Sequence, residues 1–138
     1  EHATYAVYGN STGTISVSSV VLRNNNYGIN AITTNAISVS DCQFQDNSYG
    51  IKITGGSIDL ASTSFTGNTT YGFYSTGVAP GLLDANMVFT DNATAFRVDG
   101  VAGPNLMSTA LSTRMTAGTS PWVRTTPSAG RVWRTAGR

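Results

Sequence analysis

Apolar and polar residues alternate in short runs along this chain, and the same runs return at a fixed interval. The clearest marker is the dipeptide Tyr-Gly, which recurs every 22 residues at Tyr27-Gly28, Tyr49-Gly50 and Tyr71-Gly72. The segments that align on it are residues 15–31, 37–53 and 58–75, with weaker copies at 5–7 and 82–98. A fixed period of this length is typical of repeat proteins whose units stack on their neighbours.

Within each repeat the apolar residues fall at alternate positions, as at 15 and 17, 20 and 22, and 29 and 31. This is the period of a half-buried strand, so each repeat holds about three short strands. No segment has helical periodicity, and leucine is too scarce for a leucine-rich repeat. The sequence therefore predicts an all-β protein, a parallel β-helix of about four to five 22-residue turns.

The aligned repeats form columns of one chemical character, and six columns are predominantly apolar. These are Ile15/Ile37/Ile58/Leu82, Val17/Val39/Leu60, Val20/Cys42/Thr63/Met87, Leu22/Phe44/Phe65/Phe89, Val7/Ile29/Ile51/Phe73/Phe96 and Ala31/Ile53/Ser75/Val98. We expect them to face the core, with Cys42 as a buried core thiol. A seventh column, Asn25/Asn47/Asn68/Asn92, predicts a ladder of stacked amides at a bend between strands.

The phrase V-x-x-C-x-F-x-x-N-x-Y-G-I-x-I at residues 39–53 resembles the repeat of the right-handed parallel β-helix, pectate-lyase-like superfamily. The resemblance covers about residues 5–98 and implies a right-handed, single-stranded β-helix. The superfamily includes polysaccharide lyases, polygalacturonases, alginate epimerases and the tailspikes and tail fibres of bacteriophages. Since the matching positions are core and corner residues, the resemblance indicates the fold more than the function.

Charge divides the chain into two parts. Residues 1–103 contain seven acids and three basic residues, whereas residues 104–138 contain five arginines and no acid. We expect 1–103 to form the repeats and 104–138 to form a C-terminal capping segment, with a β-hairpin over 122–134. The basic segment suits docking on an acidic surface of its own trimer or of a missing partner, and binding of nucleic acid or an anionic polymer is the alternative interpretation. Because the body is acidic, we do not expect nucleic acid as a partner.

Side chains next to the core columns should point outward, and one such stripe has the chemistry of a binding surface. It consists of Asn30, Lys52, Tyr74 and Arg97, which each follow a residue of the Ile29/Ile51/Phe73/Phe96 column. An amide, two cations and an aromatic ring suit hydrogen bonding and stacking against an acidic glycan. An ordinary solvated strand face is the alternative interpretation.

Two carboxylates are the candidates for catalysis. Asp46 and Asp91 share a column two turns apart, which places them roughly 10 Å from each other by the strand spacing, within the range used in glycoside hydrolysis. Both immediately precede a ladder asparagine at a bend, where aspartate is a common turn residue, so turn chemistry is the favoured account. The Gly-His-Gly and Asp-Pro-His signatures of superfamily enzymes are absent, and whether the parent protein is an enzyme stays open.

The sequence suggests no metal site and no cofactor, because its one histidine, His2, and its one cysteine have no clustered partners. No apolar run approaches the length of a transmembrane helix. The chain begins inside a repeat, which leads us to expect that it is the C-terminal piece of a longer protein.

Three functions follow as hypotheses. The first is a structural, glycan-binding β-helix resembling the distal part of a phage tailspike or surface fibre, a homotrimer attached to host-surface polysaccharide. The second is the C-terminal part of a polysaccharide lyase or hydrolase whose catalytic turns lie mostly upstream. The third is a bacterial surface adhesin. All three predict an extracellular protein, on a virion tail or a cell surface.

Overall fold

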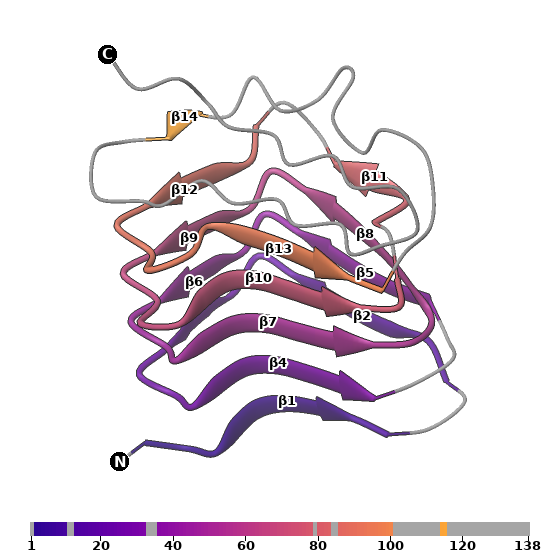
Figure 1. The fold of residues 1–138 in the computed structure, drawn as a ribbon. Helices are drawn as coiled ribbons and strands as arrows, with labels where there is room; N and C mark the ends of the chain where they lie inside the picture. The colour runs from indigo at the N-terminus through magenta and orange to yellow at the C-terminus, as the bar shows by residue number, and fades with distance from the viewer. Residues whose placement is uncertain are drawn as a thin grey trace.

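The computed structural model describes residues 2–10, 13–32, 36–78, 80–83, 86–100 and 114–115. In these ranges all regular structure is β-strand, wound into a stack of turns that rises from the N-terminus (Figure 1). The predicted all-β, parallel β-helix is confirmed. None of the described residues forms a helix long and apolar enough to cross a membrane.

Each turn contributes one strand to each of three parallel sheets, named A, B and C. Sheet A is ordered β1 (Tyr5–Gly9), β4 (Tyr27–Ile32), β7 (Tyr49–Thr54), β10 (Tyr71–Thr76) and β13 (Phe96–Asp99). Sheet B contains β2 (Ile15–Ser18), β5 (Ala36–Ser40), β8 (Ser57–Ala61) and β11 (Leu82–Leu83). Sheet C contains β3 (Val21–Arg23), β6 (Gln43–Gln45), β9 (Ser64–Thr66), β12 (Val88–Thr90) and β14 (Arg114–Met115).

The strand register reproduces the sequence columns with one exception. Ile37 pairs with Ile58 as expected, but Leu82 pairs with Asp59, and Leu83 takes the place beside Leu60. The expected position of Leu82 is therefore wrong by one residue. The reason is an extra residue in this turn, which has six steps from Leu83 to Phe89 where the preceding turn has five from Leu60 to Phe65.

Phenylalanine rings fill the centre of the rod. Phe44, Phe65 and Phe89 stack in succession, with ring centroids 5.0 and 4.8 Å apart and planes within 10°. Each is 0% exposed. Aromatic pairs of this kind contribute about 0.5–1.5 kcal/mol beyond burial alone. Cys42 is buried as predicted, whereas Val20 in the same column is 37% exposed because it lies in the turn at the N-terminal end of the stack.

The asparagine ladder is confirmed at the bend between sheets C and A. The Oδ1 atom of Asn68 accepts hydrogen bonds from the backbone N–H and the Nδ2 of Asn47, both at 3.2 Å. Asn68 in turn donates through its backbone N–H and Nδ2 to Asn92 Oδ1, at 3.1 and 2.6 Å, and through Nδ2 to the Phe44 carbonyl at 3.0 Å. Asn47, Asn68 and Asn92 are all 0% exposed, so these amides satisfy buried backbone groups at each bend.

The glycine of each Tyr-Gly pair is required by close packing. A Cβ atom added at Gly50 would lie 2.4 Å from the carbonyl oxygen of Gly72 and 2.8 Å from a ring carbon of Phe65. Gly28 and Gly72 meet equivalent atoms of the next turn. The strand can approach both its neighbour and the phenylalanine stack only without a side chain here.

We predict that Gly50→Ala lowers the free energy of unfolding by about 1–3 kcal/mol, because the added methyl group overpacks the core against backbone. Gly13→Ala is the matched control, since no atom of the described residues lies within 4 Å of a Cβ at that position. Urea unfolding followed by circular dichroism measures both. Equal stability of Gly50→Ala and the wild type would contradict this packing.

We predict that Asn68→Ala costs at least ~3 kcal/mol of unfolding free energy, because it leaves several buried backbone and amide groups without partners. The matched control is Asn26→Ala, an exposed asparagine two turns away, which we expect to change stability by less than ~0.5 kcal/mol. The same urea titration compares them. A similar small loss for both variants would show that the ladder does not stabilise the rod.

Within the predicted capping segment, 104–138, the structure describes β14 only. This strand extends sheet C beyond β12, with Met115 in register with Phe89, a pairing that the sequence analysis did not anticipate. The predicted hairpin at 122–134 lies outside the described residues. The division at residue 103 stays a prediction.

Candidate functional site

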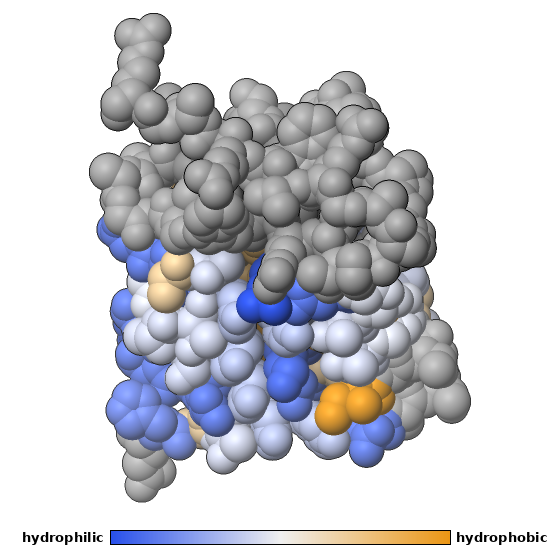
Figure 2. Space-filling model, viewed as in Figure 1, coloured by the Kyte–Doolittle hydropathy of each residue, from blue (hydrophilic) through white to orange (hydrophobic). Residues whose placement is uncertain are grey.

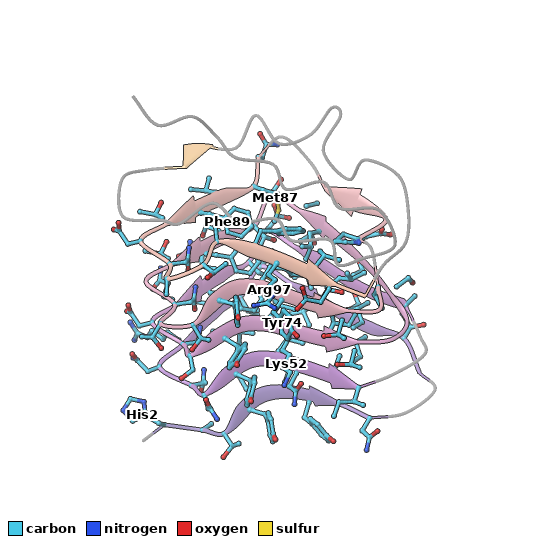
Figure 3. The ribbon with its side chains drawn as sticks, viewed as in Figure 1. His2, Lys52, Tyr74, Met87, Phe89 and Arg97 are labelled. Atoms are coloured by element: carbon cyan, nitrogen blue, oxygen red, sulfur yellow. The ribbon has the colours of Figure 1, made fainter. Side chains whose placement is uncertain are left out.

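The predicted binding stripe lies on the outward face of sheet A. Asn30 pairs with Lys52, Lys52 with Tyr74, and Tyr74 with Arg97, so the four residues form one continuous column along the rod. Tyr8 pairs with Asn30 and extends this column by one turn. Figure 3 shows Lys52, Tyr74 and Arg97 one above another on the front of the molecule. We call Tyr8, Asn30, Lys52, Tyr74 and Arg97 the outer column.

A second column of tyrosines stands beside the outer column. Its members, which we call the tyrosine ladder, are Tyr5, Tyr27, Tyr49 and Tyr71. Together the two columns contain all six tyrosines of the chain. We call the two columns together the tyrosine face. Sequence reasoning recognised the Tyr-Gly repeat but missed this surface, because strand alternation places a tyrosine two residues before an inward apolar residue on the inner face. The glycine between them, which packs against the phenylalanine stack, is where the alternation breaks.

The rings of the tyrosine ladder largely cover one another. Tyr27 stacks on Tyr5 and on Tyr49, with centroids 5.3 and 4.9 Å apart and planes 24° and 21° apart. Tyr71 is 5.5 Å from Tyr49 and stacks on Tyr74 at 5.0 Å. Because ring faces are occupied by neighbouring rings, the ladder offers a ligand mainly ring edges and hydroxyl groups. This geometry favours hydrogen bonding over stacking of a sugar on the ladder.

Lys52 is the cation at the centre of this face. Its Nζ atom lies 5.6 Å from the ring centroids of both Tyr27 and Tyr49, within range of a cation–π interaction. The ion pair between Arg97 and Asp99 is the one found among the described residues, so Lys52 has no carboxylate partner there. Its charge is therefore held in place by aromatic rings and is not neutralised by a described side chain.

Arg97 is occupied by internal contacts. Its Nε donates to Asp99 Oδ2 at 2.8 Å and its Nη1 donates to the hydroxyl of Tyr71 at 2.9 Å. The guanidinium carbon also lies 5.7 Å from the ring centroids of Tyr71 and Tyr74. Partial burial acts to lower the pKa of Arg97, but the hydrogen bond and charge of Asp99, with Tyr71, outweigh it and raise that pKa. The charge of Arg97 is thus engaged by Asp99 and Tyr71, and the side chain serves mainly to hold these two groups in position.

The remaining groups of the face are neutral. Burial, followed by the neighbouring phenols of Tyr27, Tyr71 and Tyr74, raises the pKa of Tyr49, so its hydroxyl stays protonated at neutral pH. Asn30 is only 6% exposed, which leaves little of its amide available to a ligand. In Figure 2 the middle of this face is mostly pale, and the strongly hydrophilic surface there lies where Figure 3 labels Lys52 and Arg97.

Asp46 and Asp91 lie on the bend between sheets C and A and belong to neither column of the tyrosine face. Their backbone φ angles are 53° and 52°, and the equivalent residues of other turns, Asn24 and Gly67, have φ of 58° and 66°. Left-handed backbone is most accessible to glycine, asparagine and aspartate, which accounts for the residue found at all four positions. Both carboxylates are exposed. Turn geometry explains their presence without a catalytic role.

We predict that Asp91→Gly keeps or slightly raises stability, whereas Asp91→Val lowers the unfolding free energy by about 1–2 kcal/mol, because a β-branched residue is strained in the left-handed region. Thermal or urea unfolding distinguishes the two variants. If Asp91→Gly destabilised the protein as much as Asp91→Val, the carboxylate itself would have a role that the backbone does not explain.

The fold and the tyrosine face define a class: a parallel β-helix repeat protein with an aromatic, weakly cationic outer sheet. The family model of NosD, described as a periplasmic copper-binding protein, matches residues 1–120. The chain therefore belongs to the NosD family. Neither a curated protein nor a solved structure matches it.

The described residues do not fit a copper site. Copper is held by converging imidazole, thiolate or thioether ligands. Cys42 is 1% exposed inside the rod, with its Sγ directed at the Ser40 carbonyl at 3.1 Å, and Met87 lies two turns away in the same column with Thr63 between them. His2 contacts the Asn24 carbonyl on the outside. No group of three histidine, cysteine or acidic side chains among the described residues is arranged to hold a metal.

Proposed function

We propose that this chain is a binding β-helix of the periplasm or cell surface whose tyrosine face recognises an acidic polysaccharide. The observation that carries the proposal is the gathering of all six tyrosines, with Lys52 and Arg97, on the outer face of one sheet. The family description supports a location outside the cytoplasm. Phenolic hydroxyls donate and accept hydrogen bonds, as sugar hydroxyls require.

The repeat geometry supports a polysaccharide that lies along the rod. Successive turns are separated by roughly 4.8 Å, the spacing of hydrogen-bonded strands. An extended glycan advances by a similar distance for each sugar. Successive sugars would therefore meet successive members of the tyrosine face, and a single extended chain could contact several turns at once.

The proposal assigns this chain binding and no chemistry. Asp46 and Asp91 have a turn explanation, and they stand on a bend, not on the tyrosine face. The hypothesis of a polysaccharide lyase or hydrolase therefore depends on catalytic turns outside this sequence. Hydrolysis of a polysaccharide by this chain alone, lost on Asp46→Asn or Asp91→Asn, would favour the enzyme over the binding module.

Two of the three hypotheses, the phage tailspike and the bacterial surface adhesin, agree with a binding role at a surface. NosD family membership supports a bacterial periplasmic or surface protein, close to the adhesin hypothesis, more than the distal part of a phage tailspike. The tailspike hypothesis requires a homotrimer. Light scattering of the purified chain separates them, since a trimer supports the tailspike and a stable monomer supports the single-chain surface protein.

We predict that the double variant Tyr27→Phe/Tyr49→Phe weakens binding to an acidic polysaccharide by about tenfold, because it removes two hydroxyls that each contribute roughly 0.5–1.5 kcal/mol while keeping the rings. The matched control is Ser16→Ala/Ser38→Ala, which removes two exposed hydroxyls from paired positions of sheet B. Biolayer interferometry on immobilised polysaccharides measures both. Equal binding by the two double variants would exclude the tyrosine face as the binding surface.

A further inference from the structure

Charge on the tyrosine face is concentrated at one point. We propose that this face binds one acidic sugar of its glycan, through Lys52, and prefers polysaccharides whose acidic sugars are separated by neutral ones. The inference rests on the proposed function and adds the class of polysaccharide that the site selects. The preference for a single charge follows from which cations of the outer column are already neutralised by neighbouring side chains.

Below Lys52 the outer column is neutral. Asn30 pairs with Lys52 one turn down and is almost fully covered, and Tyr8 pairs with Asn30 one turn further. Neither residue can neutralise a carboxylate. A glycan lying along the column would meet mainly the exposed phenol of Tyr8 here, which suits the hydroxyls of neutral sugars.

Above Lys52 the next cation is already paired. Arg97 lies two turns away, roughly 10 Å by the strand spacing, with Tyr74 between them. Its Nε is bound to Asp99 Oδ2, and Asp99 Oδ1 is buried with no hydrogen-bond partner among the described residues. A second acidic sugar placed here would face the charge of Asp99 as well as that of Arg97. It would gain little, because the pair is close to neutral overall.

The described part of the chain offers a densely charged polymer no second unpaired cation on this face. Besides Lys52, the basic residues of 1–103 are Arg97, which is paired with Asp99, and Arg23, which lies on β3 of sheet C. One acidic sugar at Lys52 gains attraction, while further acidic sugars along the same face meet groups that are neutral or already paired.

Lys52 is also prepared for this role before the ligand binds. Its ammonium group is held over Tyr27 and Tyr49 at 5.6 Å from each ring centroid, which limits its freedom. A long side chain that is already ordered loses less conformational entropy on binding. The same contacts fix the turn of the rod at which the acidic sugar sits.

The experiment compares oligosaccharides of gellan, whose glucuronates are separated by neutral sugars, with oligogalacturonate, in which every sugar is a uronate. Titration calorimetry is run at low and at physiological salt with the wild type, Lys52→Gln, Lys52→Arg and the double variant Arg97→Gln/Asp99→Asn. We expect the wild type to bind the gellan oligosaccharides at least fivefold more tightly than oligogalacturonate. Lys52→Gln should weaken gellan binding about tenfold and abolish its salt dependence, since it removes one charge-assisted contact.

The other variants separate the effect of the Lys52 charge from the effect of disturbing the structure of the tyrosine face. Lys52→Arg should keep the salt dependence. Arg97→Gln/Asp99→Asn removes both members of the ion pair and so keeps the net charge, and it should leave the salt dependence unchanged even if overall affinity falls. Tighter binding of oligogalacturonate than gellan, or a salt dependence that disappears in Arg97→Gln/Asp99→Asn and not in Lys52→Gln, would overturn the inference. Absence of all binding by the folded wild type would instead overturn the proposed function itself.

Discussion

The parallel pairing of successive turns is the constraint on which the rest of this molecule depends. Backbone hydrogen bonds between turns, such as those from Tyr49 to Asn26 and from Ser64 to Cys42, fix the distance from each residue to its equivalent in the next turn. That distance is short enough for equivalent side chains to touch. Every column must therefore hold residues that tolerate contact with their own kind. Stacked phenylalanines inside, bonded asparagines at a bend and stacked tyrosines outside are three solutions to the same requirement.

The same constraint governs charge. Like charges at neighbouring places in a column would repel each other at close range, so an outer column cannot repeat one charged residue as the core repeats phenylalanine. The outer column obeys this rule, because the neutral Tyr74 separates Lys52 from Arg97. Arg97 is further neutralised by Asp99, two residues along the same strand. The close stacking of turns thus explains why this tyrosine-rich surface has few charges, and the proposed recognition uses the same property.

Alignment of the repeats predicts most of the fold, because residues in one column of the alignment are neighbours in successive turns. It fails where the period changes: one extra residue between Leu83 and Phe89 displaced Leu82 from its expected column. The outer column was predictable, since strand alternation places it on one side. The stacking of the tyrosine ladder and the bond from Arg97 to the Tyr71 hydroxyl were not, because they depend on side-chain rotamers that alternation does not specify.

Membership of a family described by copper binding does not by itself place copper on these turns. Core positions such as that of Cys42 are selected for packing, and its thiol is sealed between neighbouring turns with its hydrogen directed at a backbone carbonyl. A metal there would need donors pointing inward from adjacent turns, yet the column offers Thr63 and then Met87. In the recognition that we propose for the tyrosine face, the rigid stack is the feature that matters, because its side chains are ordered before any ligand arrives.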